Sequence, residues 1–276
     1  MLVDSHCHLQ DKKFKSDVDA VISRASEAGI TAMVTIGYDM ESSRRGIEIA
    51  DSYENVYATI GVHPHDAKDL RPKDIDELTR MADSARVIGV GEIGYDFYRN
   101  LSPREEQDRA FRAQLDLARD LKLPVVIHSR DADEATYHVI AEYEAAARAG
   151  WPRDRPLGIM HCYAGDLPLA LRYIELGFVI SIAGTVTYPN AERLRAVAAG
   201  IPLRWMAVET DAPYLPPQPM RGKRNEPAYV ADTAKFIAEL RGDTLAEVCD
   251  RTATTAAWLF GLGDIGEPTG VTKAAQ

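Results

Sequence analysis

The 276-residue sequence is poor in cysteine and has no long apolar run. Its three cysteines, Cys7, Cys162 and Cys249, form an odd number without the spacing of a disulfide framework, which favours a reducing compartment and predicts a cytoplasmic protein. No uninterrupted apolar stretch reaches the roughly 20 residues that cross a bilayer. The N-terminus also lacks the basic segment and apolar core of a signal peptide. The sequence therefore indicates no membrane role.

Positive charge is also scarce. Lysine and arginine number 32 against 42 aspartate and glutamate residues, which gives a formal net charge of -10. Non-specific nucleic-acid binding depends on clustered lysine and arginine, so this balance argues against a protein that coats nucleic acid. It leaves open an enzyme with a local basic groove. The hydrophobic fraction of 46% is ordinary for a soluble globular protein, and the length fits one large barrel or two modest domains.

Short β-branched or apolar runs alternate with longer segments of helical periodicity along the chain. We interpret the runs as eight strands, at 2–6, 32–36, 56–61, 87–92, 125–128, 158–161, 178–182 and 205–209. The intervening segments predict helices at 17–28, 41–53, 73–84, 103–121, 131–147, 166–176, 191–199 and 227–240. Ser102, followed by Pro103 and Glu105, is typical of a capped helix start.

Alternation of strand and helix implies parallel strands joined by crossover helices, and eight such units match a closed (β/α)8 TIM barrel forming a single α/β domain. The alternative is an open doubly wound sheet. Its usual glycine-rich turn after the first strand is absent, because His6-Cys7-His8 stands there. A further helix at 245–259 is expected to close the lower end of the barrel. We expect a barrel domain over 1–262 and a flexible tail over 263–276, rich in glycine, threonine and alanine.

The first predicted strand carries two histidines two residues apart. Side chains alternate between the faces of a strand, so His6 and His8 point the same way while Cys7 points oppositely. The pair could chelate a metal, or both imidazoles could be satisfied by hydrogen bonds. Cys7 is interpreted as a packing residue, and so is Cys162.

Further candidate ligands stand at the ends of other predicted strands, where a barrel places its active site. They are His63, His65, Glu92, His128, His161 and Asp211. Polar residues gather at barrel mouths in general, which explains one or two of these but not the whole set. Imidazole and carboxylate ligands suit one or two divalent ions, of zinc, manganese, cobalt or, less readily, magnesium.

The local sequences around these residues resemble the TatD family of metal-dependent deoxyribonucleases, which belongs to the amidohydrolase-like barrels. The resemblance covers nearly the whole chain and rests on several separated motifs. They are Asp4-Ser5-His6-Cys7-His8-Leu9, Gly61-Val62-His63-Pro64-His65, Gly91-Glu92-Ile93-Gly94-Tyr95-Asp96, Pro124-Val125-Val126-Ile127-His128-Ser129-Arg130, His161-Cys162-Tyr163 with Gly165, Glu209-Thr210-Asp211-Ala212-Pro213-Tyr214-Leu215, Arg221-Gly222-Lys223-Arg224-Asn225-Glu226-Pro227, and Gln107, Phe111, Gln114 and Leu115.

The resemblance implies two divalent metal ions. The first would be held by His6, His8, Glu92 and Asp211, and the second by Glu92, His128 and His161, with Glu92 bridging. Many relatives in the wider superfamily bridge their metals with a carbamylated lysine, but no lysine stands at a matching strand end here.

Three residues are expected to take part in catalysis: Asp211 as general base, Glu92 as bridge, and His63 beside the metals. His63 would orient a phosphate oxygen or protonate the leaving oxygen. The role of His65 stays open between function and loop stabilisation.

Basic residues after the eighth strand are candidates for binding substrate phosphate. Arg221, Lys223 and Arg224 lie in a loop position that commonly receives phosphate in barrels, although they could instead be solvated or paired with Glu226. Arg99 and Arg130, just past other strand ends, could add to this patch or brace the metal ligands. Aromatic residues at this end could stack on bases or simply pack; they are Tyr95, Phe97, Tyr98, Tyr163 and Tyr214.

The leading hypothesis is a phosphodiesterase that cuts DNA from the 3′ end, as the family resemblance implies, with single-stranded DNA or 3′ ends as its partner. A second is hydrolysis of an ester or amide, including D-aminoacyl-tRNA deacylation, on the same metal centre. Basic side chains that face the metals and can bind phosphate would favour the DNA-cutting hypothesis. An apolar cleft would favour ester or amide hydrolysis. The third is a non-catalytic metal-binding interaction protein. It ranks last because no ligand position of the family pattern is substituted.

Overall fold

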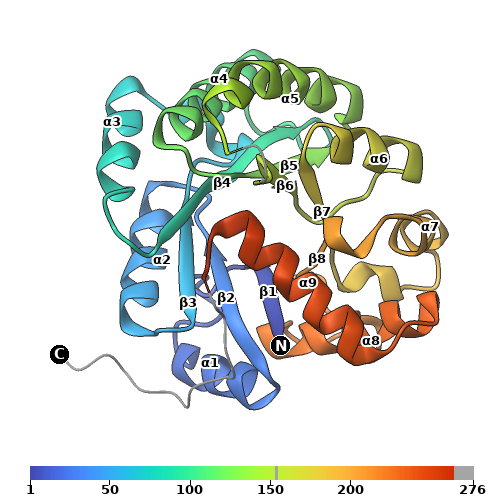
Figure 1. Cartoon of the computed structure of the whole chain (residues 1–276). Coiled ribbons are helices and arrows are strands. Elements are labelled where there is room, and N and C mark those ends of the chain that lie inside the picture. The colour runs from blue at the N-terminus through green and yellow to red at the C-terminus, as the bar shows by residue number, and fades with distance from the viewer. Residues whose placement is uncertain (153–154, 264–276) are drawn as a thin grey trace.

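The computed structural model describes residues 1–152 and 155–263. Eight parallel strands form one sheet in sequence order, with helices around it (Figure 1). The strands are β1 Leu2–Cys7, β2 Ile30–Ile36, β3 Val56–Ile60, β4 Val87–Asp96, β5 Val125–Arg130, β6 Gly158–Met160, β7 Phe178–Ile182 and β8 Met206–Val208. The helices are α1 Val18–Glu27, α2 Met40–Ser52, α3 Pro72–Met81, α4 Arg104–Leu121, α5 Asp133–Ala147, α6 Leu167–Glu175, α7 Glu192–Gly200, α8 Val230–Arg241 and α9 Leu245–Phe260. The predicted (β/α)8 barrel is confirmed.

The sheet closes between β1 and β8 by contacts just beyond the end of β8. An isolated parallel bridge joins Cys7 to Ala212, and the amide of Asp211 donates to the carbonyl of His6 at 2.9 Å. The buried carboxylate of Asp4 accepts hydrogen bonds from the amide and the hydroxyl of Thr210, at 2.9 and 2.6 Å. This seam fixes His6 and Asp211 relative to one another, although they are about 200 residues apart in the sequence.

The opposite end of the barrel is filled by the last helix. Leu259 and Phe260 of α9 join a buried apolar cluster with side chains from the strands, namely Val34, Ile36, Ile88, Val126, Ile159, Val179 and Ala207. Figure 1 shows α9 lying across this end, near the N-terminus of the chain. The structure therefore confirms the additional helix and its position. Apart from Gly263, the predicted tail over 263–276 lies outside the described residues.

The strands that carry candidate ligands differ in length from their predicted ranges. β4 continues to Asp96 and β5 to Arg130, with Gly94 paired to His128. Gly94 has a φ of +141°, and a Cβ there would lie 2.0 Å from the carbonyl oxygen of His128. The absence of a side chain lets the two strands run together past Glu92 to the mouth of the barrel.

The predicted cap at Ser102 is wrong. Helix α4 begins at Arg104 with Pro103 at the capping position and no side-chain cap. The buried hydroxyl of Ser102 instead donates to the carbonyl of His65 at 2.7 Å and accepts from the amide of Lys68 at 3.2 Å. Ser102 therefore holds the loop that carries His65.

Two further findings bear on the environment of the protein. Within residues 1–152 and 155–263, no helix combines the length and the apolar character that a membrane crossing requires. All three cysteines are free, and Cys7 is fully buried.

Candidate metal centre

The six residues predicted as metal ligands lie at one end of the barrel. His6 belongs to β1 and His8 follows it, Glu92 and His128 belong to β4 and β5, and the remaining two follow β6 and β8. Their ligand atoms, together with one nitrogen of His63, form three groups in which all atoms lie within 4.8 Å of one another. The groups are His6 with His161 and Asp211, His6 with His8 and Glu92, and His63 with Glu92 and His128.

One oxygen of Glu92 faces the ligands from the first strand. Its Oε2 lies 3.5 Å from Nε2 of His6 and 4.0 Å from Nε2 of His8. Oδ1 of Asp211 lies 3.7 and 3.4 Å from the same two nitrogens. The four residues predicted for the first metal therefore lie close to one another.

The other oxygen of Glu92 faces a different set of imidazoles. Its Oε1 lies 2.6 Å from Nδ1 of His128, 2.9 Å from Nε2 of His161 and 3.4 Å from Nε2 of His63. The two oxygens of this buried carboxylate therefore point to different imidazoles, and His161 lies between the two sets, because its ring also stacks on that of His6 with centroids 3.8 Å apart. A bridging carboxylate between two cations requires that its two oxygens face different ligands.

The carboxylates of the site are ionised. Burial opposes ionisation of Glu92, but the charge of His161 and the other neighbouring imidazoles outweighs it and holds the pKa well below the ordinary value. The pKa of Asp211 is also lowered, because the hydrogen bond from His8 and the nearby imidazoles overcome the effect of burial. The same carboxylate charges attract a divalent cation.

Hydrogen bonds orient two of the histidines for metal binding. Nδ1 of His8 lies 3.0 Å from the carbonyl oxygen of Ile36, and Nδ1 of His161 lies 3.2 Å from Oε1 of Glu209. Both partners are acceptors, so each Nδ1 carries a proton, and each Nε2 is the atom that a bound metal would take as its ligand. Glu209 is fully buried and also accepts from the amide of Cys162 at 2.7 Å.

The residues present fit a divalent metal. Among the described residues, no lysine or arginine pairs with Glu92 or Asp211, so imidazoles alone meet the buried carboxylate of Glu92 and the partly buried one of Asp211. Nε2 of His6 and Nε2 of His8 lie only 3.3 Å apart, and the buried Nδ1 of His6 has no hydrogen-bond partner. Converging nitrogen lone pairs and carboxylate oxygens are a donor set that zinc, manganese and cobalt accept.

His63 differs from the other histidines of the centre. Its Nδ1 accepts a hydrogen bond from the amide of His65 at 3.1 Å, and burial lowers its pKa to about 4. A neutral imidazole that accepts at Nδ1 carries its proton on Nε2, the atom that faces Glu92. His63 is therefore a hydrogen-bond donor at the centre. His65 contacts Asp96 at 2.8 Å through Nε2.

A cavity of about 870 Å³ opens over the metal centre. Arg99 and Arg130 line it, as do two cations that the sequence analysis did not single out, Lys12 and Arg45. Within the described part of the chain, Arg99 and Arg130 form no ion pair with a carboxylate.

The basic loop after β8 does not line this cavity. Arg224 is bonded to Asp17 at 2.7 Å and to Glu226 at 2.9 Å. The guanidinium of Arg221 stacks on the ring of Tyr188 at 4.5 Å, and Lys223 is exposed. For Arg224, the alternative that it pairs with Glu226 therefore fits the structure better than the prediction that it binds phosphate.

The aromatic residues near the mouth divide into two groups. Tyr95 and Tyr163 are buried, so they pack within the protein. Tyr98 and Tyr214 are 62% and 43% exposed, and the guanidinium of Arg130 lies 4.0 Å from the ring centroid of Tyr98. Phe97 is partly buried and packs on Tyr95, with ring centroids 5.2 Å apart, so the two exposed tyrosines are the best placed to stack on a base.

Sequence reasoning gave no role to two buried acids that hold the histidines. Glu209 orients His161, and Asp96 contacts His65 at 2.8 Å while lying 3.4 Å from Nε2 of His128. Both stand inside the motifs that carry the family resemblance. Their position next to candidate ligands was the available signal, but spacing alone does not reveal which buried carboxylate meets which imidazole.

A (β/α)8 barrel with clustered histidines and carboxylates at the carboxyl ends of its strands defines the class of metal-dependent barrel hydrolases. Comparison with known proteins then gives the family. A family model described as TatD related DNase matches residues 3–261, and the chain belongs to this family.

The similar proteins agree with this assignment. The chain is 37% identical to an uncharacterized metal-dependent hydrolase, YabD, of Bacillus subtilis, over 94% of this chain and 99% of that protein. It is 34% identical to a protein of Salmonella typhimurium named 3′-5′ ssDNA/RNA exonuclease TatD, over 92% and 98%. The crystal structure of YJJV, a TatD homolog from Escherichia coli, superposes with a TM-score of 0.86 at 29% identity, covering 94% of this chain and 98% of that one.

Proposed function

We propose that this protein is a divalent-metal-dependent exonuclease that removes nucleotides from the 3′ end of single-stranded DNA. The observation that carries the proposal is the position of the Glu92 carboxylate, whose two oxygens face different ligands. This arrangement supports a centre with two ions. Zinc, manganese, magnesium and cobalt all remain candidates for their identity.

The metal ions, when bound, activate water as a nucleophile and neutralise charge on the phosphate. His6, His8 and Asp211 would hold one ion, His128 and His161 the other, and Glu92 both. Asp211, at 14% side-chain exposure the most open of the carboxylates that face the centre, is the proposed general base and receives the proton of the attacking water.

His63 is proposed to bind the scissile phosphate. Its Nε2 carries a proton and faces Glu92 at 3.4 Å, and its lowered pKa keeps the ring neutral near neutral pH. A neutral imidazole with Nε2–H donates a hydrogen bond to a phosphate oxygen without repelling the nearby cations. Of the two roles expected for His63, this tautomer favours orienting a phosphate oxygen over protonating the leaving group.

The shape of the site favours the end of a single strand. The ligands lie deep in the barrel, with His6, His8 and Glu92 all at most 5% exposed, beneath a cavity of about 870 Å³. A cavity of this size is comparable to a small-molecule site and admits a terminal nucleotide rather than a duplex. Arg99 and Arg130 are the proposed phosphate-binding cations, because they line the cavity without a carboxylate partner in the described part of the chain.

Strand-end assays test this proposal. Single-stranded DNA labelled at its 5′ end should shorten stepwise in the presence of a divalent metal, while the same strand labelled at its 3′ end should release a labelled mononucleotide at once. EDTA should stop both reactions. Release of the 5′ label first, or internal cleavage, would contradict the proposed direction.

Parallel substrates separate the alternatives. RNA tests how far the substrate range of the similar exonucleases extends to this chain, and a D-aminoacyl-tRNA tests the deacylase hypothesis. Metal-dependent release of the amino acid without DNA shortening would favour deacylation. The proposed cellular location is the cytoplasm, which the three free cysteines support.

A further inference from the structure

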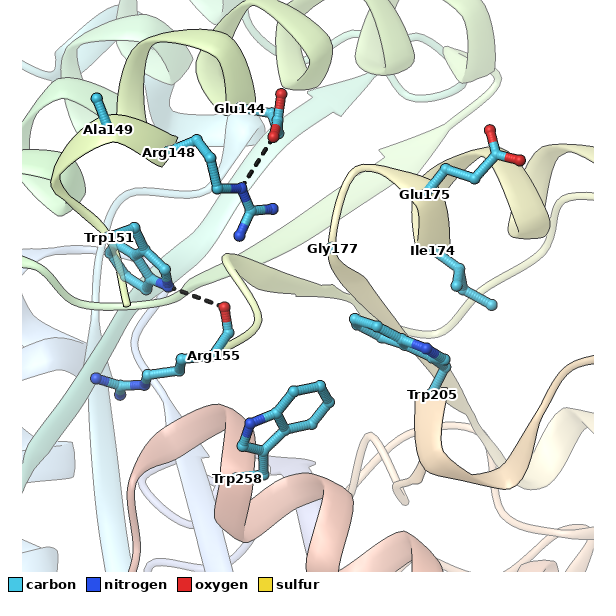
Figure 2. A pocket seen from close by; sticks show the side chains of 10 residues that line it. All are labelled: Glu144, Arg148, Ala149, Trp151, Arg155, Ile174, Glu175, Gly177, Trp205 and Trp258. Carbon is cyan, nitrogen blue, oxygen red and sulfur yellow. Dashed lines mark hydrogen bonds and ion pairs between the residues drawn. The ribbon is translucent and has the colours of Figure 1, made fainter. Parts of the chain in front are cut away.

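A second cavity lies at the opposite end of the barrel from the metal centre. Figure 2 shows the side chains that line it. Its volume is about 630 Å³, within the range of small-molecule sites. It is bounded by the segments that lead into three strands: Trp151 and Arg155 precede β6, Gly177 precedes β7, and Trp205 precedes β8. The end of α9 completes its wall with Trp258. None of these residues lines the cavity over the metal centre.

All three tryptophans of the chain line this cavity. The rings of Trp205 and Trp258 lie with centroids 5.2 Å apart and planes inclined at 60°, and Trp258 is 36% exposed. Figure 2 shows these two rings on one side of the cavity, with Trp151 and the two arginines across from them. Tryptophan is the side chain with the largest aromatic surface, so the partly open ring of Trp258 offers a face on which a planar group can stack, with Trp205 at its side.

Arg155 adds a cation to the wall of the cavity on the side of Trp151, whose ring centroid lies 5.7 Å from the guanidinium (Figure 2). Its Nε donates to the carbonyl of Leu259 at 3.1 Å, and its half-buried position lowers its pKa. Within the described residues no carboxylate lies within 4 Å of its guanidinium, whereas the neighbouring Arg148 pairs with Glu144 at 2.9 Å. Figure 2 shows the side chain of Glu175, the other acid of the lining, directed away from Arg155. A partly desolvated guanidinium that has no counter-charge among residues 1–152 and 155–263 favours an anion from outside.

We propose that this cavity is a second ligand site, which binds a planar aromatic anion of nucleotide size. The ring of the ligand stacks on the exposed ring of Trp258, next to Trp205, and its anionic group accepts hydrogen bonds from the terminal amino groups of Arg155. The choice of a nucleoside 5′-monophosphate as this anion rests on the proposed function, because such a molecule is what the exonuclease would release. The site itself lies outside the metal centre and does not depend on catalysis.

Intrinsic fluorescence measures binding at this site selectively, because every tryptophan of the chain lines it. The full-length protein, as purified, is titrated with dAMP while tryptophan emission is followed. We expect saturable quenching. Adenosine, which lacks the phosphate, and inorganic phosphate, which lacks the ring, should each bind about tenfold more weakly, the effect of losing one charged hydrogen bond or one stacking contact.

Variants separate this site from the mouth of the barrel. Arg155→Gln should weaken dAMP binding about tenfold, and Trp258→Ala should weaken it while two tryptophans still report. If Arg155→Gln folds poorly, Arg155→Lys takes its place. This variant keeps the charge and should retain part of the affinity for dAMP. Arg86→Gln is the matched control, since Arg86 also donates to a backbone carbonyl and faces an aromatic ring, that of Tyr57, but lies outside the cavity. Thermal melting checks the folding of each variant.

The possible results divide clearly. Quenching that is saturable in the wild type and in Arg86→Gln, but weakened in Arg155→Gln and Trp258→Ala, supports the second site. Absence of saturable quenching, or equal affinity in all variants, overturns it. Emission that changes with protein concentration but not with dAMP also overturns it and assigns the cavity to self-association. Glu92→Gln should bind dAMP like the wild type, so a failure of the exonuclease assay leaves this measurement intact.

Discussion

The two ends of the barrel are built from different chemistry. At the carboxyl ends of the strands, buried imidazoles and carboxylates such as His6 and Glu92 converge beneath an open cavity. At the other end, Leu259 and Phe260 from α9 fill the space between the strands with apolar side chains. At the first end, polar and charged side chains occupy buried positions where apolar side chains would stabilise the fold more. The difference indicates that catalysis and stability depend on opposite ends and can be changed separately.

The largest expected effect on activity is at the mouth. Glu92→Gln should lower metal-dependent DNA shortening by more than about a hundredfold, because the loss of groups that merely support metal ligands already costs about 10- to 100-fold. The free energy of unfolding of the metal-free protein should fall to a smaller degree than the activity, because burial opposes the charge of Glu92 but the neighbouring imidazoles stabilise it. Stopped assays with end-labelled DNA and urea melts measure the two quantities. Activity near the wild-type level would remove the distinction between the ends.

At the other end of the barrel, Leu259→Ala should do the reverse. The fully buried side chain packs against the strands, and its truncation should lower the free energy of unfolding by about 2–5 kcal/mol. The specific activity of the folded fraction should not change. Leu245→Ala on the same helix is the control, because Leu245 is 46% exposed. A loss of activity in Leu259→Ala that exceeds the loss of folded protein would show that the two ends are coupled.

A smaller effect is expected from a residue that does not face the metals directly. Glu209→Gln removes the negative charge beside Nδ1 of His161 while leaving an oxygen for the amide of Cys162. Metal affinity should fall about 10- to 100-fold, as measured by competition with a chelating dye. Glu144→Gln, which breaks the ion pair with Arg148 at the other end, should leave metal affinity unchanged. Equal metal affinity in Glu209→Gln and the wild type would show that Glu209 only supports the backbone.

The smallest effect separates the two sets of basic residues. Arg130→Gln should weaken DNA binding about tenfold and reduce the slope of log affinity against log salt by about one, because Arg130 lines the cavity. Arg224→Gln should leave both unchanged, since Arg224 is committed to Asp17 and Glu226. Fluorescence anisotropy with labelled single-stranded DNA measures binding. The opposite ranking would favour the loop after β8 as the phosphate site.

Features that depend on the regular alternation of strands and helices were predictable from the sequence. Strand alternation places His6 and His8 on one face, and parallel strands bring their carboxyl ends to one edge, so the barrel and the convergence of its candidate ligands followed from local patterns. These inferences need only periodicity and topology.

Pairings between distant side chains were not predictable in this way. Glu209 meets His161 across 48 residues, and Arg224 meets Asp17 across 207. Nothing in the local sequence says whether a basic residue near the mouth pairs with an acid or faces the cavity. The gathering of three tryptophans at the far end has the same cause, because Trp151, Trp205 and Trp258 come from separate segments.

The central claim is that Glu92 joins two metal positions through its two oxygens. The most direct measurement is the number of divalent ions bound per chain, obtained by equilibrium dialysis and elemental analysis of the wild type and Glu92→Gln. We expect two ions per chain in the wild type and fewer than one tightly bound ion in the variant, because both positions lose a carboxylate oxygen. A wild type that saturates with one ion, or a variant that retains two, would contradict it.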